Sequence, residues 1–114
     1  MDAEKFASEM WERLKDVAVA YGAFAKKMRV DENELYVVDA LWDAPDGLSQ
    51  RSICEACDLG KQTISAICKR LSARGFIIAQ PSSSDKREKI MALTPEGRDA
   101  WCHSVELMRE LELQ

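Results

Sequence analysis

Four polar residues stand close together at the start of a predicted helix in the middle of the chain: Lys61, Gln62, Thr63 and Ser65. Short polar side chains near a helix N-terminus can reach DNA base edges and phosphates, and the helix dipole favours an anionic backbone there. Gln62 is the best candidate for base recognition, because a Gln amide can form two hydrogen bonds to adenine. Lys69 and Arg70 lie two turns further along and are expected to meet the DNA backbone. The alternative interpretation is an ordinary solvated helix face.

A second group of charged residues lies in a serine-rich loop between two short apolar runs. Lys86 and Arg87, followed by Lys89, would suit a hairpin tip that lies along a minor groove, where the negative potential attracts Arg. Asp85 would repel DNA by itself, so we expect it to pair with Arg87 and orient the guanidinium. A loop that is merely charged and solvated is the alternative.

The elements around these residues form a recognisable order. Ser49 is placed to cap a helix from 50 to about 57, a turn at 58–60 follows, and a second helix runs from 61 to 74, with Gly75 suited to its C-terminus. Short apolar runs at 76–79 and 89–93 predict a β-hairpin. Two helices joined by a tight turn and followed by a hairpin are a helix-turn-helix with a wing, a device that grips duplex DNA.

Long amphipathic helices flank this central segment. A helix from about Ala3 to Met28 carries an apolar seam at heptad spacing: Phe6, Met10, Leu14, Val17, Tyr21, Phe24 and Met28. This seam is either intramolecular core or, in part, a subunit interface. A helix is expected from Asp31, with Glu34 completing a capping box. The last helix follows a cap at Thr94 and has its own apolar stripe: Trp101, Val105, Met108 and Leu111.

Charge is unevenly distributed along the 114 residues. The net charge is -4, which taken alone argues against a nucleic-acid partner. Residues 48–98, however, contain 9 Lys/Arg and 5 Asp/Glu, whereas the segments on either side are acidic. Any surface that faces phosphate must therefore belong to the middle segment. We find no apolar run of membrane-spanning length and no signal-peptide pattern, so we expect a cytoplasmic protein.

The four cysteines could suggest a metal or redox site. Cys54 and Cys57 form a CxxC pair, but no second pair follows at zinc spacing and His103 is the only histidine, so we expect no metal. Buried, inert thiols are the simpler interpretation, with redox sensing at Cys54 or Cys102 as the alternative. The sequence also has no nucleophile–base pair and no glycine-rich phosphate loop. We therefore expect neither an enzyme nor a bound cofactor.

Several short motifs in this order resemble the MarR (multiple-antibiotic-resistance regulator) family of winged-helix repressors. The resemblance covers about Leu35 to Arg98, and the residues that carry it are Leu48-Ser49, Lys61-Gln62-Thr63-Ile64-Ser65, Lys69-Arg70-Leu71, Arg74-Gly75-Phe76, Asp85-Lys86-Arg87 and Leu93-Thr94-Pro95-Glu96-Gly97-Arg98. The sequence departs from the family at Ala66, where Arg is frequent, and at Ala79-Gln80, where basic residues are common. Both departures would weaken phosphate contacts.

The resemblance implies a mainly α fold with a small β-hairpin (α+β), in a single domain spanning 1–114. Residues 1–30 and 94–114 would be dimerisation helices, and 31–93 a DNA-binding lobe with its wing at about 76–93. The expected DNA contacts are Ser49, Lys61, Gln62, Thr63, Ser65, Lys69, Arg70, Asp85, Lys86 and Arg87. The expected dimer contacts are Phe6, Met10, Leu14, Val17, Trp101, Val105 and Met108.

The leading hypothesis is therefore a homodimeric transcriptional regulator, more often a repressor, that binds a pseudo-palindromic double-stranded DNA operator. A ligand or an oxidant would release it. The rival hypothesis is a winged-helix module that binds protein, either as an anti-repressor or as a partner that sequesters a longer regulator. A small-molecule effector could bind between the dimer helices and the DNA-binding lobe, lined by Trp11, Tyr21, Phe24 and Trp42, although these aromatic residues could equally be core.

Overall fold

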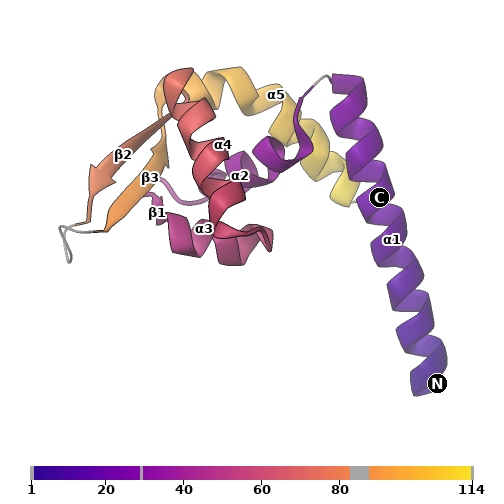
Figure 1. The fold of residues 1–114 in the computed structure, drawn as a ribbon. Helices are drawn as coiled ribbons and strands as arrows, with labels where there is room; N and C mark the ends of the chain where they lie inside the picture. The colour runs from indigo at the N-terminus through magenta and orange to yellow at the C-terminus, as the bar shows by residue number, and fades with distance from the viewer. Residues whose placement is uncertain (1, 29, 83–87, 114) are drawn as a thin grey trace.

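The structure of the chain is a computed structural model that describes residues 2–28, 30–82 and 88–113. Within the first helix, the side chains of Val17, Tyr21, Phe24 and Met28 lie outside the description. The described part contains five helices and three short strands in the order α1 Ala3–Met28, α2 Glu32–Trp42, β1 Leu48–Ser49, α3 Gln50–Cys57, α4 Lys61–Ala73, β2 Ile77–Pro81, β3 Lys89–Leu93 and α5 Pro95–Glu112 (Figure 1).

Side-chain caps set the start of three helices. Asp31 accepts a hydrogen bond from the backbone N–H of Glu34 at 3.0 Å, and Thr94 accepts one from Gly97 at 3.0 Å. Ser49 caps α3 in the same way through Ser52, at 3.1 Å. Each bond satisfies an N–H group that the first turn leaves without a helical partner. The predicted starts of α2, α3 and α5 are confirmed.

The strands form an antiparallel sheet in the order β1-β3-β2, so β3 is central. The predicted hairpin is formed by β2 and β3. In the structure Ile77 lies opposite Leu93 and Pro81 lies opposite Lys89. The two-residue strand β1 was not predicted, because so short a segment has no period of its own. Gly47 precedes it with a φ of +90°, and a Cβ there would lie 2.6 Å from the carbonyl oxygen of Met91. Only glycine lets the chain pass β3 at this point.

The core is built around α2. Leu35, Val37, Val38 and Leu41 are completely buried and lie in one apolar cluster with side chains of α3, α4, β2, β3 and α5. Those partners include Ile53, Ile64, Ile67, Leu71 and Ile77. Because α2 is apolar on several sides, it can be covered by neighbours in all directions. It therefore connects the helix-turn-helix α3–α4 to the long helix α5.

The apolar stripe of α5 is used inside the protomer. Trp101, Val105 and Met108 are 4%, 1% and 1% exposed and belong to the same core cluster as α2. Because these side chains are already covered within the protomer, they have little surface left for the dimer contact that was predicted for them, which stays a prediction. Their periodicity correctly indicated burial, but α2 of the same chain covers them, and the ring of Phe76 meets Trp101 edge-on at 6.5 Å.

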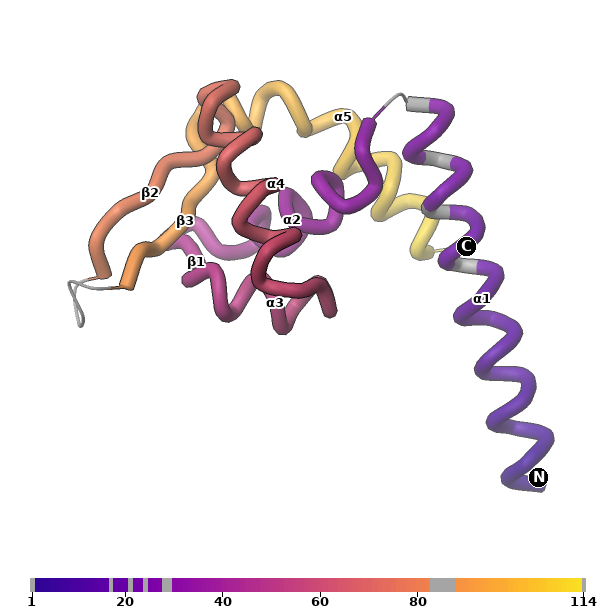
Figure 2. The backbone as a smooth tube through the Cα atoms, in the orientation of Figure 1, coloured from indigo at the N-terminus to yellow at the C-terminus, as the bar shows by residue number. Residues whose placement is uncertain are grey.

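The N-terminal half of α1, in contrast, extends away from the rest of the protomer (Figures 1 and 2). Phe6, Met10, Trp11 and Leu14 are 45% to 62% exposed, and Val19 is 72% exposed. The contacts of α1 with α2 and α5 occur in its C-terminal half, where Ala25 is buried. None of the helices in the described residues is long and apolar enough to cross a membrane.

Candidate nucleic-acid interface

The turn between α3 and α4 leaves the N-terminus of α4 open. Asp58 has a left-handed backbone conformation with φ 52°, and Leu59 donates a hydrogen bond to the carbonyl of Cys54 at 3.2 Å. Gly60 then occupies the cap position of α4 and provides no side-chain hydrogen bond. The first N–H groups of α4 therefore carry the positive end of the helix dipole without a side-chain cap hydrogen bond. This geometry favours an anionic partner.

The helical period of α4 determines which of its side chains are buried and which are exposed. Ile64, Ile67, Cys68 and Leu71 face the core, whereas Lys61, Gln62 and Thr63 are exposed. Ser65 is half-buried, and Lys69 is exposed two turns along. The predicted base and phosphate candidates on α4 thus share one solvent-facing surface, apart from Ser65 at its margin.

A groove of about 380 Å³ adjoins this surface between α3 and α4. It is lined by Gln50, Arg51, Cys54, Glu55 and Lys61. Gln50 and Arg51 were not among the predicted contacts. Both lie in the first turn of α3, directly after its cap.

Ser49 forms the helix cap that was predicted for it. It is 9% exposed, accepts the backbone N–H of Ser52 and donates to the hydroxyl of Ser52 at 3.1 Å. Its backbone also pairs with Ile90 of β3. The Ser49 hydroxyl is thus engaged in the cap, which disfavours a DNA contact, and the predicted contact stays a prediction.

Arg70 contacts the carboxylate of Glu34 on α2. Glu34 is 7% exposed, and its carboxylate lies 3.6 Å from Nε of Arg70 and 3.0 Å from a terminal nitrogen of Arg74. Of the predicted capping box, the bond from the Glu34 N–H to Asp31 is present, while the Glu34 carboxylate forms ion pairs with Arg70 and Arg74. Arg74, which was not predicted to have a role, also stacks over Phe76 with its guanidinium carbon 4.7 Å from the ring centre.

The two strands of the predicted wing are present in the structure. Strands β2 and β3 project from the helical body on the side opposite α1 (Figure 1), and Ser82 donates to the carbonyl of Glu88 at 2.9 Å beyond their last paired residues. Lys89 is exposed on β3. The predicted contacts Asp85, Lys86 and Arg87 lie outside the described residues.

The thiols are free, and the described residues contain no cluster of three or more potential metal ligands. Burial raises the pKa of Cys57 and of Cys68 to about 11. Cys102 donates to Glu106 at 3.3 Å, and this hydrogen bond to a carboxylate raises the Cys102 pKa. A raised pKa opposes the reactive thiolate. Of the two predicted redox residues, Cys102 is therefore disfavoured, and redox sensing at Cys54 stays a prediction.

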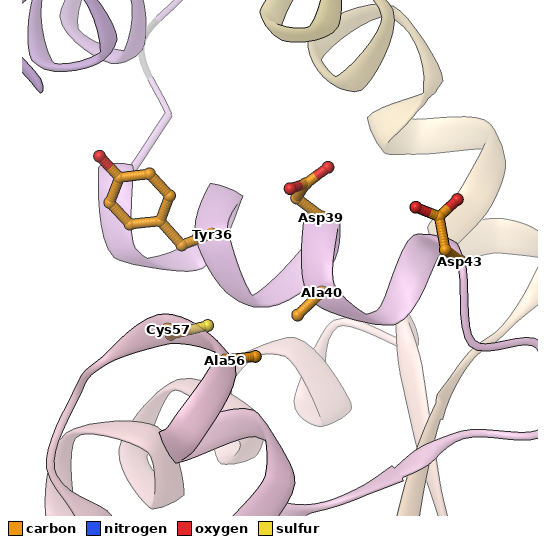
Figure 3. Close-up of a pocket in the computed structure, with 6 residues that line it drawn as sticks. All are labelled: Tyr36, Asp39, Ala40, Asp43, Ala56 and Cys57. Atoms are coloured by element: carbon orange, nitrogen blue, oxygen red, sulfur yellow. The ribbon is translucent and has the colours of Figure 1, made fainter. Parts of the chain in front are cut away.

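A second pocket, of about 440 Å³, lies between α2 and α3 (Figure 3). Its walls are Tyr36, Asp39, Ala40 and Asp43 of α2 and Ala56 and Cys57 of α3. Figure 3 shows the two carboxylates directed toward the side of α5, from which Arg109 contacts Asp39 and Asp43 at 3.0 Å each. Neither Trp11 nor Trp42 lines it, although both were candidates for an effector pocket. Arg98 stacks on Trp42 at 5.1 Å from the ring centre.

The fold and the open end of α4 together define a winged helix-turn-helix protein. Solved structures with this fold include the transcriptional regulator BldR from Sulfolobus solfataricus, with a TM-score of 0.77 and 21% identity over 97% of this chain and 82% of that one. Staphylococcus aureus MepR, solved in complex with DNA, gives 0.66 and 19% over 95% and 86%. Bordetella bronchiseptica BpsR, whose DNA binding is regulated by 6-hydroxynicotinic acid, gives 0.70 and 20% over 98% and 77%.

At these identities the structural likeness establishes the fold. Among curated protein sequences, none matches the chain. The model of the MarR family, however, matches residues 30–88, from the start of α2 to the wing. The chain belongs to the MarR family and is a transcriptional regulator of winged-helix type rather than an enzyme.

Proposed function

We propose that the protein is a homodimeric repressor that binds a pseudo-palindromic operator, with α4 in the major groove and the wing at the minor groove. The open N-terminus of α4 carries this proposal. Gly60 provides no side-chain cap, and the side chains that follow it, Lys61, Gln62 and Thr63, are exposed and polar. A helix of this kind can approach base edges without a clash. That MepR has been solved in complex with DNA supports the same assignment.

The proposed dimer rests on the exposed seam of α1. Phe6, Met10 and Leu14 recur at heptad spacing and are about half-exposed in the protomer. An apolar helix face that its own domain leaves uncovered is typical of a subunit interface. With Trp101, Val105 and Met108 used in the core, we assign the N-terminal half of α1 as the main contact.

We also propose a small-molecule effector, which would act at the pocket between α2 and α3. The pocket is bounded by the helix-turn-helix on one side, and its carboxylates contact α5 through Arg109. An occupant could therefore change how the DNA-binding lobe is held. Regulation of BpsR by 6-hydroxynicotinic acid provides a precedent in a structural relative.

Selection of bound genomic fragments, followed by titration over a range of salt concentrations, tests the DNA-binding proposal. A protein that makes several phosphate contacts should lose affinity steeply between about 50 and 200 mM salt. Gln62→Ala should change base preference at one or two operator positions, whereas Lys61→Ala should weaken binding to all sequences about equally. Absence of a complex with any fragment even at low salt would overturn the proposal in favour of a protein-binding module.

A further inference from the structure

One carboxylate on α2 contacts two arginines at the C-terminal end of α4. Glu34 is 7% exposed, and within the described residues it contacts two arginines that stand one turn apart on α4. The terminal nitrogen of Arg74 lies 3.0 Å from one carboxylate oxygen, and Nε of Arg70 lies 3.6 Å from the other. A buried carboxylate is retained in a core only when cations or hydrogen-bond donors compensate its desolvation, and here both donors come from α4.

The two guanidinium groups are only partly covered by this arrangement. The side chains of Arg70 and Arg74 are 51% and 54% exposed, while that of Glu34 is 9% exposed. Arg74 is fixed further by stacking over Phe76. Each guanidinium has five N–H donors in a planar fork, so Arg70 keeps donors free for a second anion while Nε faces Glu34. Two arginines on one carboxylate leave the cluster with a net charge of +1.

The cluster lies along the helix that is proposed to enter the major groove. Arg70 is nine residues after Lys61, which places it about 13 Å further along α4. The major groove is about 12 Å wide, so a helix that presents Lys61 and Gln62 to base edges brings its later turns beside the phosphates of the groove wall. A change of one unit charge at this place is within a Debye length of those phosphates at ordinary salt concentration.

We propose that Glu34 is a positioning residue for DNA recognition: it holds Arg70 so that one edge of the guanidinium meets a backbone phosphate, and it cancels one of the two arginine charges. This inference rests on the proposed function of α4. Glu34 lowers the sequence-independent part of DNA binding, because that part grows with the number of phosphates neutralised. Discrimination between the operator and other DNA thereby increases.

The test compares Glu34→Gln with Glu32→Gln. Both variants remove one negative charge from the first turn of α2, but Glu32 accepts a hydrogen bond from Tyr36 at 2.7 Å on α2 itself. Binding to a random-sequence duplex is measured over a range of salt concentrations, together with binding to the selected genomic fragment. E34Q should raise the association constant for the random duplex about tenfold at 0.1 M salt and steepen the logarithmic salt slope by about one. E32Q should change it by less than about threefold.

Three results would bear against the inference, and they are distinguishable. If the parent protein binds neither duplex, the proposed function itself fails. If the parent binds but E34Q and E32Q have the same slope and the same discrimination, the positioning role is wrong and DNA binding stands. Should E34Q not fold, Arg70→Gln provides the second measurement: its slope should be shallower by about one, and an unchanged slope would overturn the inference.

Discussion

The role of a single side chain in this protein depends on the groups that lie next to it in the fold. Ser49 was a candidate for both a helix cap and a DNA contact, Glu34 was a candidate for a capping box, and both side chains are used inside the protomer. Lys61, Gln62 and Thr63 remain exposed at the surface. The residue type was a fair guide to the available chemistry, but the partner was set by the fold.

Gly97 provides a test of one close contact. A Cβ at this position in the first turn of α5 would overlap the carbonyl oxygen of Phe76, which accepts the N–H of Thr94 at 3.0 Å. Gly97→Ala should therefore lower the free energy of unfolding by about 1–3 kcal/mol, although alanine is the better helix former. Urea denaturation measures this change. Gly22→Ala, where the nearest atom is 3.7 Å away, is the control and should be neutral or stabilising.

Cys57 provides a second test, through its pKa of about 11. Desolvation disfavours the thiolate, and nearby Asp39 adds to this effect, so the native protein holds its proton about two pH units longer than an ordinary thiol. At pH 8 the thiolate fraction should be about a hundredfold smaller than in the unfolded chain. Alkylation by iodoacetamide in a Cys54→Ser background, followed by mass spectrometry, measures the rate. Equal rates in native protein and in urea would contradict the assignment.

The raised pKa of Cys57 also makes the stability of the protein depend on pH. The unfolded state releases the proton near pH 9, while the native state keeps it to about 11. The contribution of Cys57 is therefore fully present below pH 9 and is lost as the pH rises toward 11.

At the scale of elements, α1 and α5 show that one sequence pattern can have two outcomes. Both helices carry an apolar stripe, yet that of α5 is buried against α2 and the N-terminal half of α1 is exposed. The two helices are placed differently: α5 lies along the core, whereas α1 is next to the core only in its C-terminal turns and its N-terminal half points away (Figure 2). Periodicity indicates that a face must be covered, but not which surface covers it.

Replacement of an exposed seam residue tests the role of α1. Leu14 is 56% exposed, so Leu14→Glu should leave the stability of the isolated protomer within about 0.5 kcal/mol while it breaks the dimer through a charge in an apolar interface. Light scattering after size exclusion measures the mass. Ser8→Glu, which adds the same charge at another exposed position on α1, should remain dimeric. A Leu14→Glu protein that dimerises as the parent does would refute the assignment of the interface.

At the scale of the whole molecule, the distribution of charge matters more than its sum. The net charge of -4 would suggest a protein that avoids DNA, but the basic residues are concentrated between 48 and 98, and the acidic ones at both ends. The helix-turn-helix and wing come from the basic segment, while α1 and most of α5 come from the acidic ones. In the proposed complex, repulsion of the acidic segments from DNA would orient the molecule rather than prevent binding.

A dimer of this shape should read two half-sites on the same face of the duplex. The centres of the half-sites should lie about one helical turn, 34–36 Å, apart. Insertion of five base pairs between them places the half-sites on opposite faces and should reduce binding to the level of a random duplex. Competition titrations with the selected operator measure this loss. An operator that tolerates the half-turn insertion would mean that the protomers bind independently.

The sequence by itself determined the local features: the boundaries of the helices, the caps at Asp31, Ser49 and Thr94, the hairpin, and the polar start of α4. These depend on residues within a few positions of one another, so period and cap chemistry are sufficient. Only the tertiary structure decided that α2 covers the stripe of α5, that Glu34 holds Arg70 and Arg74, and that β1 joins the sheet. Those contacts join residues that are roughly 40 or more positions apart, and burial there depends on which surfaces meet.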